Sequence, residues 1–335
     1  MIKRIGFCCK YLDENGTTDD KSVNTRSTTV AWLKRQSLEV AEQRLWDLMV
    51  HNIAATHKMV GLVGEMDPSL RMCRIGSDLL PVYTEPTYSY FWRKPDVLAY
   101  CEREFAKVGE LARERDVRLS FHPGQFTVLA SESDDIVARS IDEFEYHVDM
   151  ARWMGYGSAW HDHGFKINVH ISGRRGPDGI RAALSRMTPE ARNLITIENE
   201  ENAHGLDAVL ALADCCAIVL DLHHHWCHSV DYLERLDPRV DIIRDSWRGV
   251  RPVLHYSLSR EDVVPAASPD TRPSFQQLIE SGHKKAHLRA HSDFMWNRAV
   301  NQYAAEYWDE FDIQVESKAK NLASRRLYEE LTCAS

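Results

Sequence analysis

The sequence predicts a (β/α)₈ TIM barrel, a closed ring of parallel strands with helices outside. Eight short apolar segments are rich in Ile, Val, Leu and Phe, as in strands buried on both faces. Stretches with apolar residues at helical spacing lie between them. Six of the segments end in, or just before, a residue that can ligate a metal, and a barrel brings all strand ends to one face. An open doubly wound sheet is the alternative, because it shares this alternation.

The predicted strands follow one another along the whole chain. They cover Ile2–Cys8, Leu70–Ile75, Val117–His122, Lys166–His170, Leu194–Glu198, Ala217–Asp221, Pro252–Tyr256 and Asp312–Glu316. The apolar spacing predicts helices over Thr28–Thr56, Pro95–Arg115, Asp134–Met154, Leu206–Ala213 and Arg298–Phe311. We expect residues 1–335 to form a single domain, because barrels of this length are routinely one domain.

The longest irregular segment is an insertion at about residues 257–290. It holds Pro265, Pro269 and Pro273, followed by His283, Lys284 and Lys285. Structureless loops of this length are uncommon and are often functional. Because the segment follows the seventh strand, we expect it to lie over the face where the strands end.

Composition limits the possible partners. No run of about 18 apolar residues is present, and the N-terminus does not have the pattern of a signal peptide, so we expect no membrane association. The eight cysteines form no CxxC pair and are expected to be free thiols in a reducing compartment. We expect a cytoplasmic monomer, associated with the nucleoid if the source is bacterial or viral. The net charge of −9 means that any DNA binding must rely on local basic patches.

The strand-end residues combine imidazole and carboxylate groups. They are His122, His170, Glu198, Asp221, His224, His255 and Glu316. This nitrogen and oxygen set suits Zn²⁺, Mn²⁺ or Fe²⁺ and does not suit a structural thiolate zinc site. The number of ligands exceeds the need of one tetrahedral ion, so we expect two or three divalent ions with Glu198 bridging two of them. Such clusters clamp the attacking and leaving oxygens of a phosphoryl displacement and generate hydroxide at neutral pH.

The choice among the histidines of DLHHHWCH stays open at this point. Asp221 is expected to act with one neighbour, but side chains alternate at a strand end, so not all the histidines can face the pocket. Periodicity alone does not choose among His223, His224, His225 and His228.

The segment HPGQF follows the third strand. Pro123 and Gly124 predict a tight turn that leaves Gln125 and Phe126 above the pocket. An amide beside an aromatic ring could read or wedge a base, and the alternative is a turn packed by its own Phe. Arg174, Arg175 and Lys318 lie near the same face and could hold phosphates, although each alone is commonly a solvated surface charge.

Motifs in the same order as in one known family run through the chain. They are RIGSDLLP at 74–81, HPGQF at 122–126, VHISG at 169–173, ITIENE at 195–200, VLDLHHH at 219–225, HYS at 255–257, HSDF at 291–294 and VESKAK at 315–320. With these motifs the chain resembles the ultraviolet damage endonuclease family, relatives of endonuclease IV among the xylose-isomerase-like barrels.

The resemblance implies a metal-dependent DNA repair endonuclease with three divalent ions, Mn²⁺ first, acting by metal-hydroxide attack. It would incise double-stranded DNA immediately 5′ of ultraviolet photoproducts. It implies Glu198, Glu316 and His122 as catalytic residues and places Gln125 and Phe126 at the damaged dinucleotide. The implied metal set is His122, His170, Glu198, Asp221, His224, His255, His291 and Glu316. The family's D-x-x-H spacing selects His224 as the partner of Asp221.

One departure concerns the strand that ends at His255. The family pattern there is K-x-H, with a lysine near the metals that can be carboxylated, and Val253 stands in its place. Lys318 is a candidate for the missing group. This departure and the acidic charge leave two alternatives, a metal-dependent barrel enzyme acting on a small molecule and a damage-binding protein with reduced catalysis.

Overall fold

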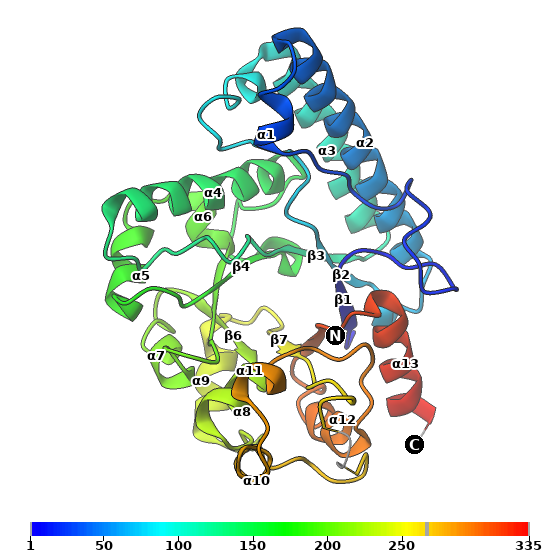
Figure 1. The fold of residues 1–335 in the computed structure, drawn as a ribbon, viewed down its shortest axis with the longest axis vertical. Helices are drawn as coiled ribbons and strands as arrows, with labels where there is room; N and C mark the ends of the chain where they lie inside the picture. Colours follow the sequence, from blue (N-terminus) through cyan, green and yellow to red (C-terminus); the bar gives the residue numbers. More distant parts are fainter. Residues whose placement is uncertain (1, 265–267, 334–335) are drawn as a thin grey trace.

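A computed structural model describes residues 2–264 and 268–333. These residues form eight parallel strands that pair in chain order, and β8 pairs with β1 to close a barrel (Figure 1). The strands are β1 (Ile5–Cys9), β2 (Met72–Ile75), β3 (Arg118–Phe121), β4 (Lys166–His170), β5 (Ile195–Glu198), β6 (Ala217–Asp221), β7 (Val253–Tyr256) and β8 (Asp312–Val315). The predicted TIM barrel is confirmed, and the open sheet is excluded because Ile5 pairs with Ile313 across the closure.

The strands are almost wholly buried, since helices cover their outer face and side chains fill the barrel. Ile167 and Val169 of β4 belong to the main apolar core, while Lys166, Asn168 and His170 alternate with them and point inward. The second strand begins at Met72, two residues later than predicted. The reason is a 3₁₀ turn, η1 (Pro68–Leu70), in which Asp67 accepts a hydrogen bond from the Ser69 amide.

Helices alternate with the strands around the barrel. They are α1 (Val30–Leu33), α2 (Leu38–Gly64), α3 (Pro95–Glu114), α4 (Asp134–Trp153), α5 (Gly176–Leu184), α6 (Pro189–Leu194), α7 (Leu206–Leu210), α8 (Leu222–Ser229), α9 (Pro238–Ser246), α10 (Phe275–Glu280), α11 (Lys285–Leu288), α12 (Arg298–Ala305) and α13 (Lys320–Cys333), with 3₁₀ turns η2 (Phe91–Arg93) and η3 (Asp162–Gly164).

The single helix predicted over Thr28–Thr56 is wrong. Two helices, α1 and α2, occupy this stretch, and α2 extends to Gly64. The break occurs at Ser37, which has extended backbone and whose side chain accepts a hydrogen bond from the Val40 amide. A serine cap inside a helical pattern is the sequence signal for this break.

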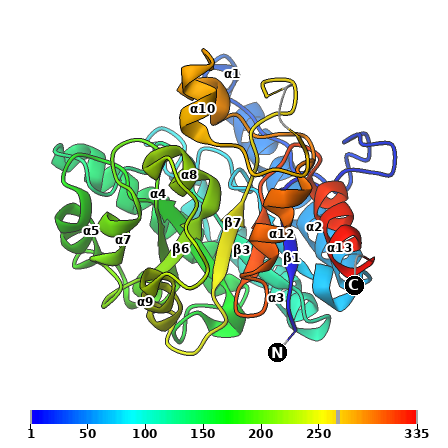
Figure 2. The ribbon, with the colours of Figure 1, turned by 90° about the horizontal axis from the view of Figure 1, so that it is seen from below.

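The insertion at 257–290 is less irregular than predicted, because it contains α10 and α11. Pro265 lies outside the described residues. Figure 2 shows α10 projecting on the side toward which the strands run, as does α1, and in Figure 1 these two helices lie on opposite sides of the barrel. The insertion therefore lies at the end of the barrel where the strand-end residues gather.

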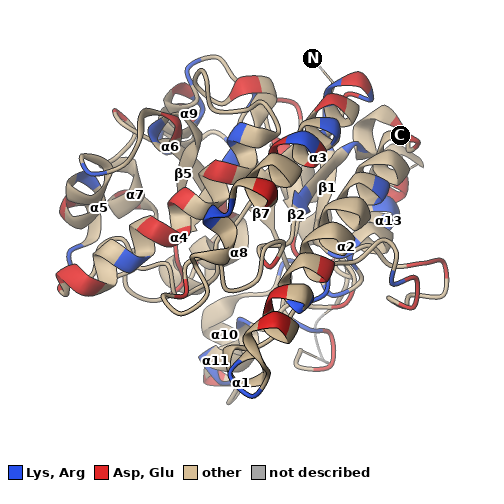
Figure 3. Ribbon diagram, turned by 90° about the horizontal axis from the view of Figure 1, so that it is seen from above, with Lys and Arg blue, Asp and Glu red and all other residues tan. Residues whose placement is uncertain are grey.

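The surface carries both signs of charge. Figure 3 shows acidic and basic residues interspersed along outer helices such as α3 and α4. Within the described residues, no helix has the length and apolar character needed to cross a bilayer. The cysteines are free thiols, as predicted.

One buried histidine gives the fold a testable pH dependence. His147 lies on α4, fully buried, with its ring packed against Tyr146 and Phe121. Its Nδ1 lies 2.8 Å from the carbonyl oxygen of Glu143, and among the described residues its Nε2 has no hydrogen-bond partner. Burial lowers the pKa of His147 to about 4.

We expect His147 to destabilise the metal-free protein as the pH falls. His147 takes up a proton near pH 6.5 in the unfolded state and only near pH 4 in the folded state. Acidification below pH 6.5 therefore favours the unfolded state and lowers the free energy of unfolding. Between pH 7 and pH 5 this group alone should lower the free energy of unfolding by about 2 kcal/mol. Urea unfolding at both pH values should show a smaller loss in His147→Phe than in wild type. The exposed His57, changed to Gln, is the control, and equal losses in all three proteins would contradict the assignment.

Candidate metal centre

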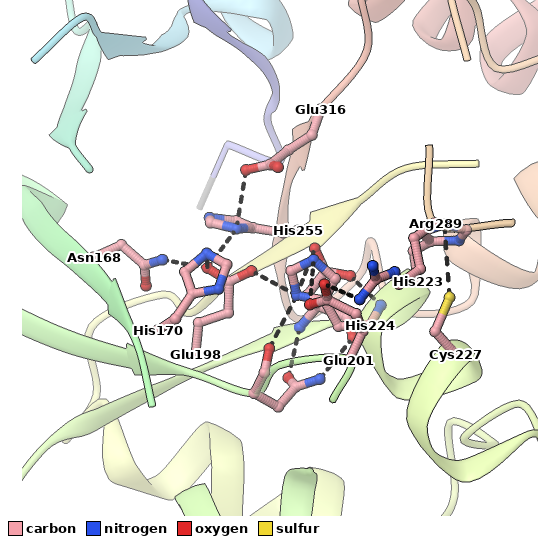
Figure 4. Close-up of polar contacts among 12 residues, drawn as sticks. Asn168, His170, Glu198, Glu201, His223, His224, Cys227, His255, Arg289 and Glu316 are labelled. Atoms are coloured by element: carbon pink, nitrogen blue, oxygen red, sulfur yellow. Dashed lines mark hydrogen bonds and ion pairs between the residues drawn. The ribbon is translucent and has the colours of Figure 1, made fainter. Parts of the chain in front are cut away.

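Glu198, the last residue of β5, is the centre of the strand-end cluster. Its fully buried carboxylate lies among His170 of β4, His255 of β7 and His224 of α8 (Figure 4), and His122, which directly follows β3, also lies beside it. The distances from its oxygens are 3.5 Å to His122 Nε2, 3.8 Å to His170 Nε2, 3.3 Å to His224 Nδ1 and 3.1 Å to His255 Nδ1. The barrel thus joins residues that are far apart in the sequence.

His122 and His170 form one donor group with Glu198. Their Nε2 atoms lie 3.1 Å apart, and both face the same oxygen of Glu198. The other nitrogen of His122, Nδ1, lies 2.9 Å from the carbonyl oxygen of Pro123, which fixes the ring with Nε2 toward the centre. Two imidazole nitrogens this close to each other and to a carboxylate could ligate one cation together.

Asp221 and His255 form a second donor group, again with Glu198. Asp221 ends β6 and caps α8, because its carboxylate accepts a hydrogen bond from the His224 amide at 2.7 Å. The segment after Asp221 is therefore a helix and not the strand end assumed from the sequence. The helix carries the His224 ring back toward the centre, where Nδ1 lies 3.7 Å from Asp221 Oδ2.

The helical geometry separates the neighbouring histidines. His223 is buried elsewhere, with Nε2 3.1 Å from the carbonyl oxygen of Leu288 in the insertion. His225 is buried near Ser229, whose hydroxyl lies 3.5 Å from its Nδ1. Of these three, only His224 contacts Glu198 in the described structure.

Glu316 directly follows β8 and joins the cluster through His255, whose Nδ1 lies 3.2 Å from Glu316 Oε1. Arg74 of β2 forms a partly buried ion pair with the same carboxylate. His291 belongs to neither donor group; its ring centre lies 6.0 Å from that of His223, and it acts with Arg74 and His255 to lower the pKa of Glu316. The structure thus gathers seven of the eight predicted ligands closely and links His291 to them through Glu316.

The predicted substrate-binding residues are exposed around this centre. The Phe126 side chain is 85% exposed, next to the exposed Gln125, in a turn closed by a hydrogen bond from the Thr127 amide to the Gly124 carbonyl. Arg174 and Arg175 lie between β4 and α5, and Arg174 reaches Glu132 at 3.4 Å. Lys318 is exposed, with its amine 3.5 Å from Asp293. None of these residues enters the cluster around Glu198.

Several polar residues that contact the cluster were missed from the sequence. Asn168 donates a hydrogen bond to Glu198, and Thr196 donates one to Asn168 at 2.7 Å. Lys166 Nζ lies 3.2 Å from His255 Nε2. Asn168 and Lys166 stand two and four residues before His170 on one strand, so the two-residue period was the signal that could have found them.

Burial and neighbouring charges shift the pKa values of the residues in the cluster. It lowers the pKa values of His122, His170 and His255, which favours neutral imidazole. Burial opposes ionisation of Glu198, but His255 and His170 outweigh it and lower the pKa of Glu198 well below its usual range. Neutral imidazole and ionised carboxylate are the forms that ligate metals. Burial also lowers the pKa of the Lys166 amine to about 7.

Several buried donor atoms in the cluster lack a hydrogen-bond partner within the part of the chain that the structure describes, as expected for metal ligands. His255 Nδ1 lies 3.1 Å from a Glu198 oxygen, but not in hydrogen-bond geometry; among the described residues, Glu198 Oε1, Asp221 Oδ2 and His255 Nδ1 are buried without a hydrogen-bond partner. Leaving such atoms unsatisfied is costly, and burial together with the charge of Glu198 already raises the pKa of Asp221. A divalent cation would satisfy all three atoms, so the residues fit the ions that the sequence predicts.

Comparison with known proteins agrees with this architecture. The chain is 25% identical over 347 residues to a UV DNA damage endonuclease of Bacillus velezensis, covering 99% of this chain and 95% of the relative. A homologue of the same description from Bacillus mycoides is 23% identical over 342 residues, with the same coverage.

Two solved structures share the fold. A crystal structure of SacUVDE matches with a TM-score of 0.74 at 19% identity, covering 99% of both chains. Endonuclease IV from Thermus thermophilus matches with a TM-score of 0.51 at 14% identity, over 83% of this chain and 94% of that one. The model of the family described as UV-endonuclease UvdE matches residues 3–334, and the chain therefore belongs to this family.

Proposed function

We propose that this protein is a metal-dependent DNA repair endonuclease that incises double-stranded DNA 5′ of ultraviolet photoproducts. The observation that carries the proposal is the position of Glu198, whose buried carboxylate belongs to both donor groups in a barrel of the UvdE family. A carboxylate shared in this way can ligate two adjacent cations, because it offers two oxygens with about four lone-pair sites. Membership in the family supports DNA as the substrate.

The eight predicted ligands divide by geometry into inner and outer positions. His122 and His170 with Glu198 would hold one ion, and Asp221 and His255 with Glu198 a second. We propose His224, His291 and Glu316 as the ligands that complete the set, for two or three ions of which Mn²⁺ is the first candidate. When bound, such ions supply Lewis acidity to the phosphodiester and lower the pKa of water.

The protein's own residues would prepare this site in three ways. Asn168 and Arg74 hold the carboxylates of Glu198 and Glu316 by hydrogen bonding and ion pairing. The carbonyl of Pro123 orients His122. Burial of the cluster excludes water from all but its open end, which strengthens every electrostatic interaction there. We accordingly propose catalytic roles for Glu198, Glu316 and His122.

Gln125 and Phe126 are the proposed lesion-reading residues. The Phe126 ring is 85% exposed and so is free to stack on a ligand. A groove of about 650 Å³ lies beside the ring, lined by Asp78, Arg139 and Glu143 among others. A damaged base displaced from the duplex could stack on Phe126 and meet polar groups there. The proposed contacts to the phosphate backbone of the DNA come from Arg174, Arg175 and Lys318. We also propose that the enzyme is a single-domain monomer.

A barrel enzyme acting on a small molecule is the second candidate. It is favoured by the net charge of −9 and by Val253 in place of the lysine that the family pattern carries. The two candidates differ in their response to salt, because binding that neutralises phosphates weakens steeply as the salt concentration rises.

Metal binding should stabilise the protein. At a Mn²⁺ concentration of about 100 times the dissociation constant, the free energy of unfolding should rise by about 2.7 kcal/mol. Glu198→Gln should remove most of this gain, since it weakens both donor groups. Glu200→Gln, a partly exposed carboxylate two residues away, is the matched control and should keep it. Chemical unfolding with and without Mn²⁺ measures the effect, and equal gains in both variants would contradict the site.

The proposed activity predicts lesion-dependent nicking. Purified protein with Mn²⁺ should convert ultraviolet-irradiated supercoiled plasmid to the open-circular form and leave unirradiated plasmid intact. Glu198→Gln should lower the rate by at least about a hundredfold, because losing even a supporting group around a metal costs 10- to 100-fold. Absence of nicking by a protein with bound metal, at low as well as moderate salt, would favour the small-molecule alternative.

Loss of the Phe126 ring should slow incision of damaged DNA without changing the amount of bound metal. Removing one stacked base contact costs about 2 kcal/mol, so Phe126→Ala should lower incision of irradiated DNA about thirtyfold. Phe126→Tyr keeps the ring and should retain activity. Bound metal, measured by elemental analysis, should be the same in all three proteins. A fully active Phe126→Ala would mean that the ring only packs its own turn.

A further inference from the structure

A lysine lies inside the barrel, beneath the proposed metal centre. Lys166 begins β4 and is 1% exposed. Lysine is almost never buried to this degree without a partner, because removing its charge from water is costly. The side chain shares the inward face of β4 with Asn168 and His170, both of which lie against Glu198.

The partner of this amine is a metal-centre histidine. Lys166 Nζ lies 3.2 Å from Nε2 of His255, whose Nδ1 lies 3.1 Å from Glu198 and 3.2 Å from Glu316. The fully buried imidazole therefore has one nitrogen toward the carboxylates and the other toward Lys166. When Nδ1 binds a cation, the neutral imidazole carries its proton on Nε2, which donates a hydrogen bond to the Lys166 amine; the amine accepts in its uncharged form, the form that burial favours. This hydrogen bond on the far nitrogen fixes the orientation of the ring, and losing it weakens metal binding.

On β7, the strand that carries His255, the residue beneath His255 on the same face is apolar. Val253, two residues earlier on the same face of β7, is 1% exposed and packs in an apolar cluster with Met72, Ala217, Val219 and Trp247. This is the position at which the resembling family carries the lysine of its K-x-H pattern. Lys318, the replacement considered from the sequence, is exposed and reaches Asp293 at 3.5 Å.

We infer that Lys166 is a positioning residue that orients His255 for metal binding and replaces, from β4, the lysine absent at Val253 of β7. The two strands are separated by β5 and β6 in the barrel, but side chains from all strands meet at its centre. The amine therefore reaches the underside of the cluster from a different strand. The inference rests on the proposed metal site and concerns the binding of metal, so its test needs no DNA.

The test measures Mn²⁺ affinity by chelator competition and bound metal by elemental analysis. Lys166→Met keeps the length of the side chain and removes its polar end, and it should weaken Mn²⁺ binding by at least about tenfold. The double variant Lys166→Val with Val253→Lys moves the lysine to β7 and should restore the affinity to within about threefold of wild type. Urea unfolding of the metal-free proteins verifies that each variant is folded.

A thermodynamic cycle separates positioning from general stability. In a His255→Ala background, Lys166→Met should cause little further loss of Mn²⁺ affinity, because the residue through which it acts is gone. Folded Lys166→Met with wild-type affinity, additive losses in the cycle, or a double variant no better than Lys166→Met would each overturn the inference. Should Lys166→Met not fold, Lys166→Gln takes its place in the same comparisons. Failure of wild-type nicking with these metal results intact would contradict only the endonuclease proposal.

Discussion

The structure depends on one constraint, the closure of the barrel around a buried carboxylate. Glu198 lies at the end of β5 with its side chain inside the ring, and four histidines from other elements lie within 3.8 Å of it. Curvature of the sheet into a barrel, closed between β1 and β8, brings these histidines together. The barrel supplies the burial, and burial makes the unsatisfied oxygens and nitrogens costly unless a cation binds.

The buried carboxylates at the two ends of the barrel interior differ in whether protein groups satisfy their hydrogen bonds. At the start of β8, Asp312 is fully satisfied by protein groups, accepting from Arg118 at 2.8 Å, Arg251 at 2.7 Å and the Arg4 amide at 2.9 Å. At the other end, Glu198 and Asp221 each keep a buried oxygen without a hydrogen-bond partner among the described residues. The same fold thus contains a closed structural ion cluster and an open one. The open one lies at the ends of the strands, where barrel enzymes carry their chemistry.

The insertion contacts the proposed metal centre from outside the barrel. The backbone oxygen of its Leu288 lies 3.1 Å from His223 Nε2. Arg289 reaches Glu201 at 3.1 Å, and the other oxygen of Glu201 lies 3.8 Å from His224 Nε2. These contacts hold the start of α8, and with it His224, in place. The insertion is therefore coupled to the geometry of the centre.

The strand order, the barrel and most of the ligand positions could be predicted from the amino-acid sequence, because both strand burial and strand-end chemistry are local patterns. His122, His170, Glu198, Asp221, His255 and Glu316 could be identified from where each apolar segment ends. The choice of His224 needed family resemblance, since only the start of α8 at Leu222 turns its ring toward Glu198. The roles of Lys166, Asn168 and Arg74 became evident only in the folded structure. Their partners are on other strands, and the distance between two side chains inside a barrel depends on the stagger of strands that no local pattern encodes.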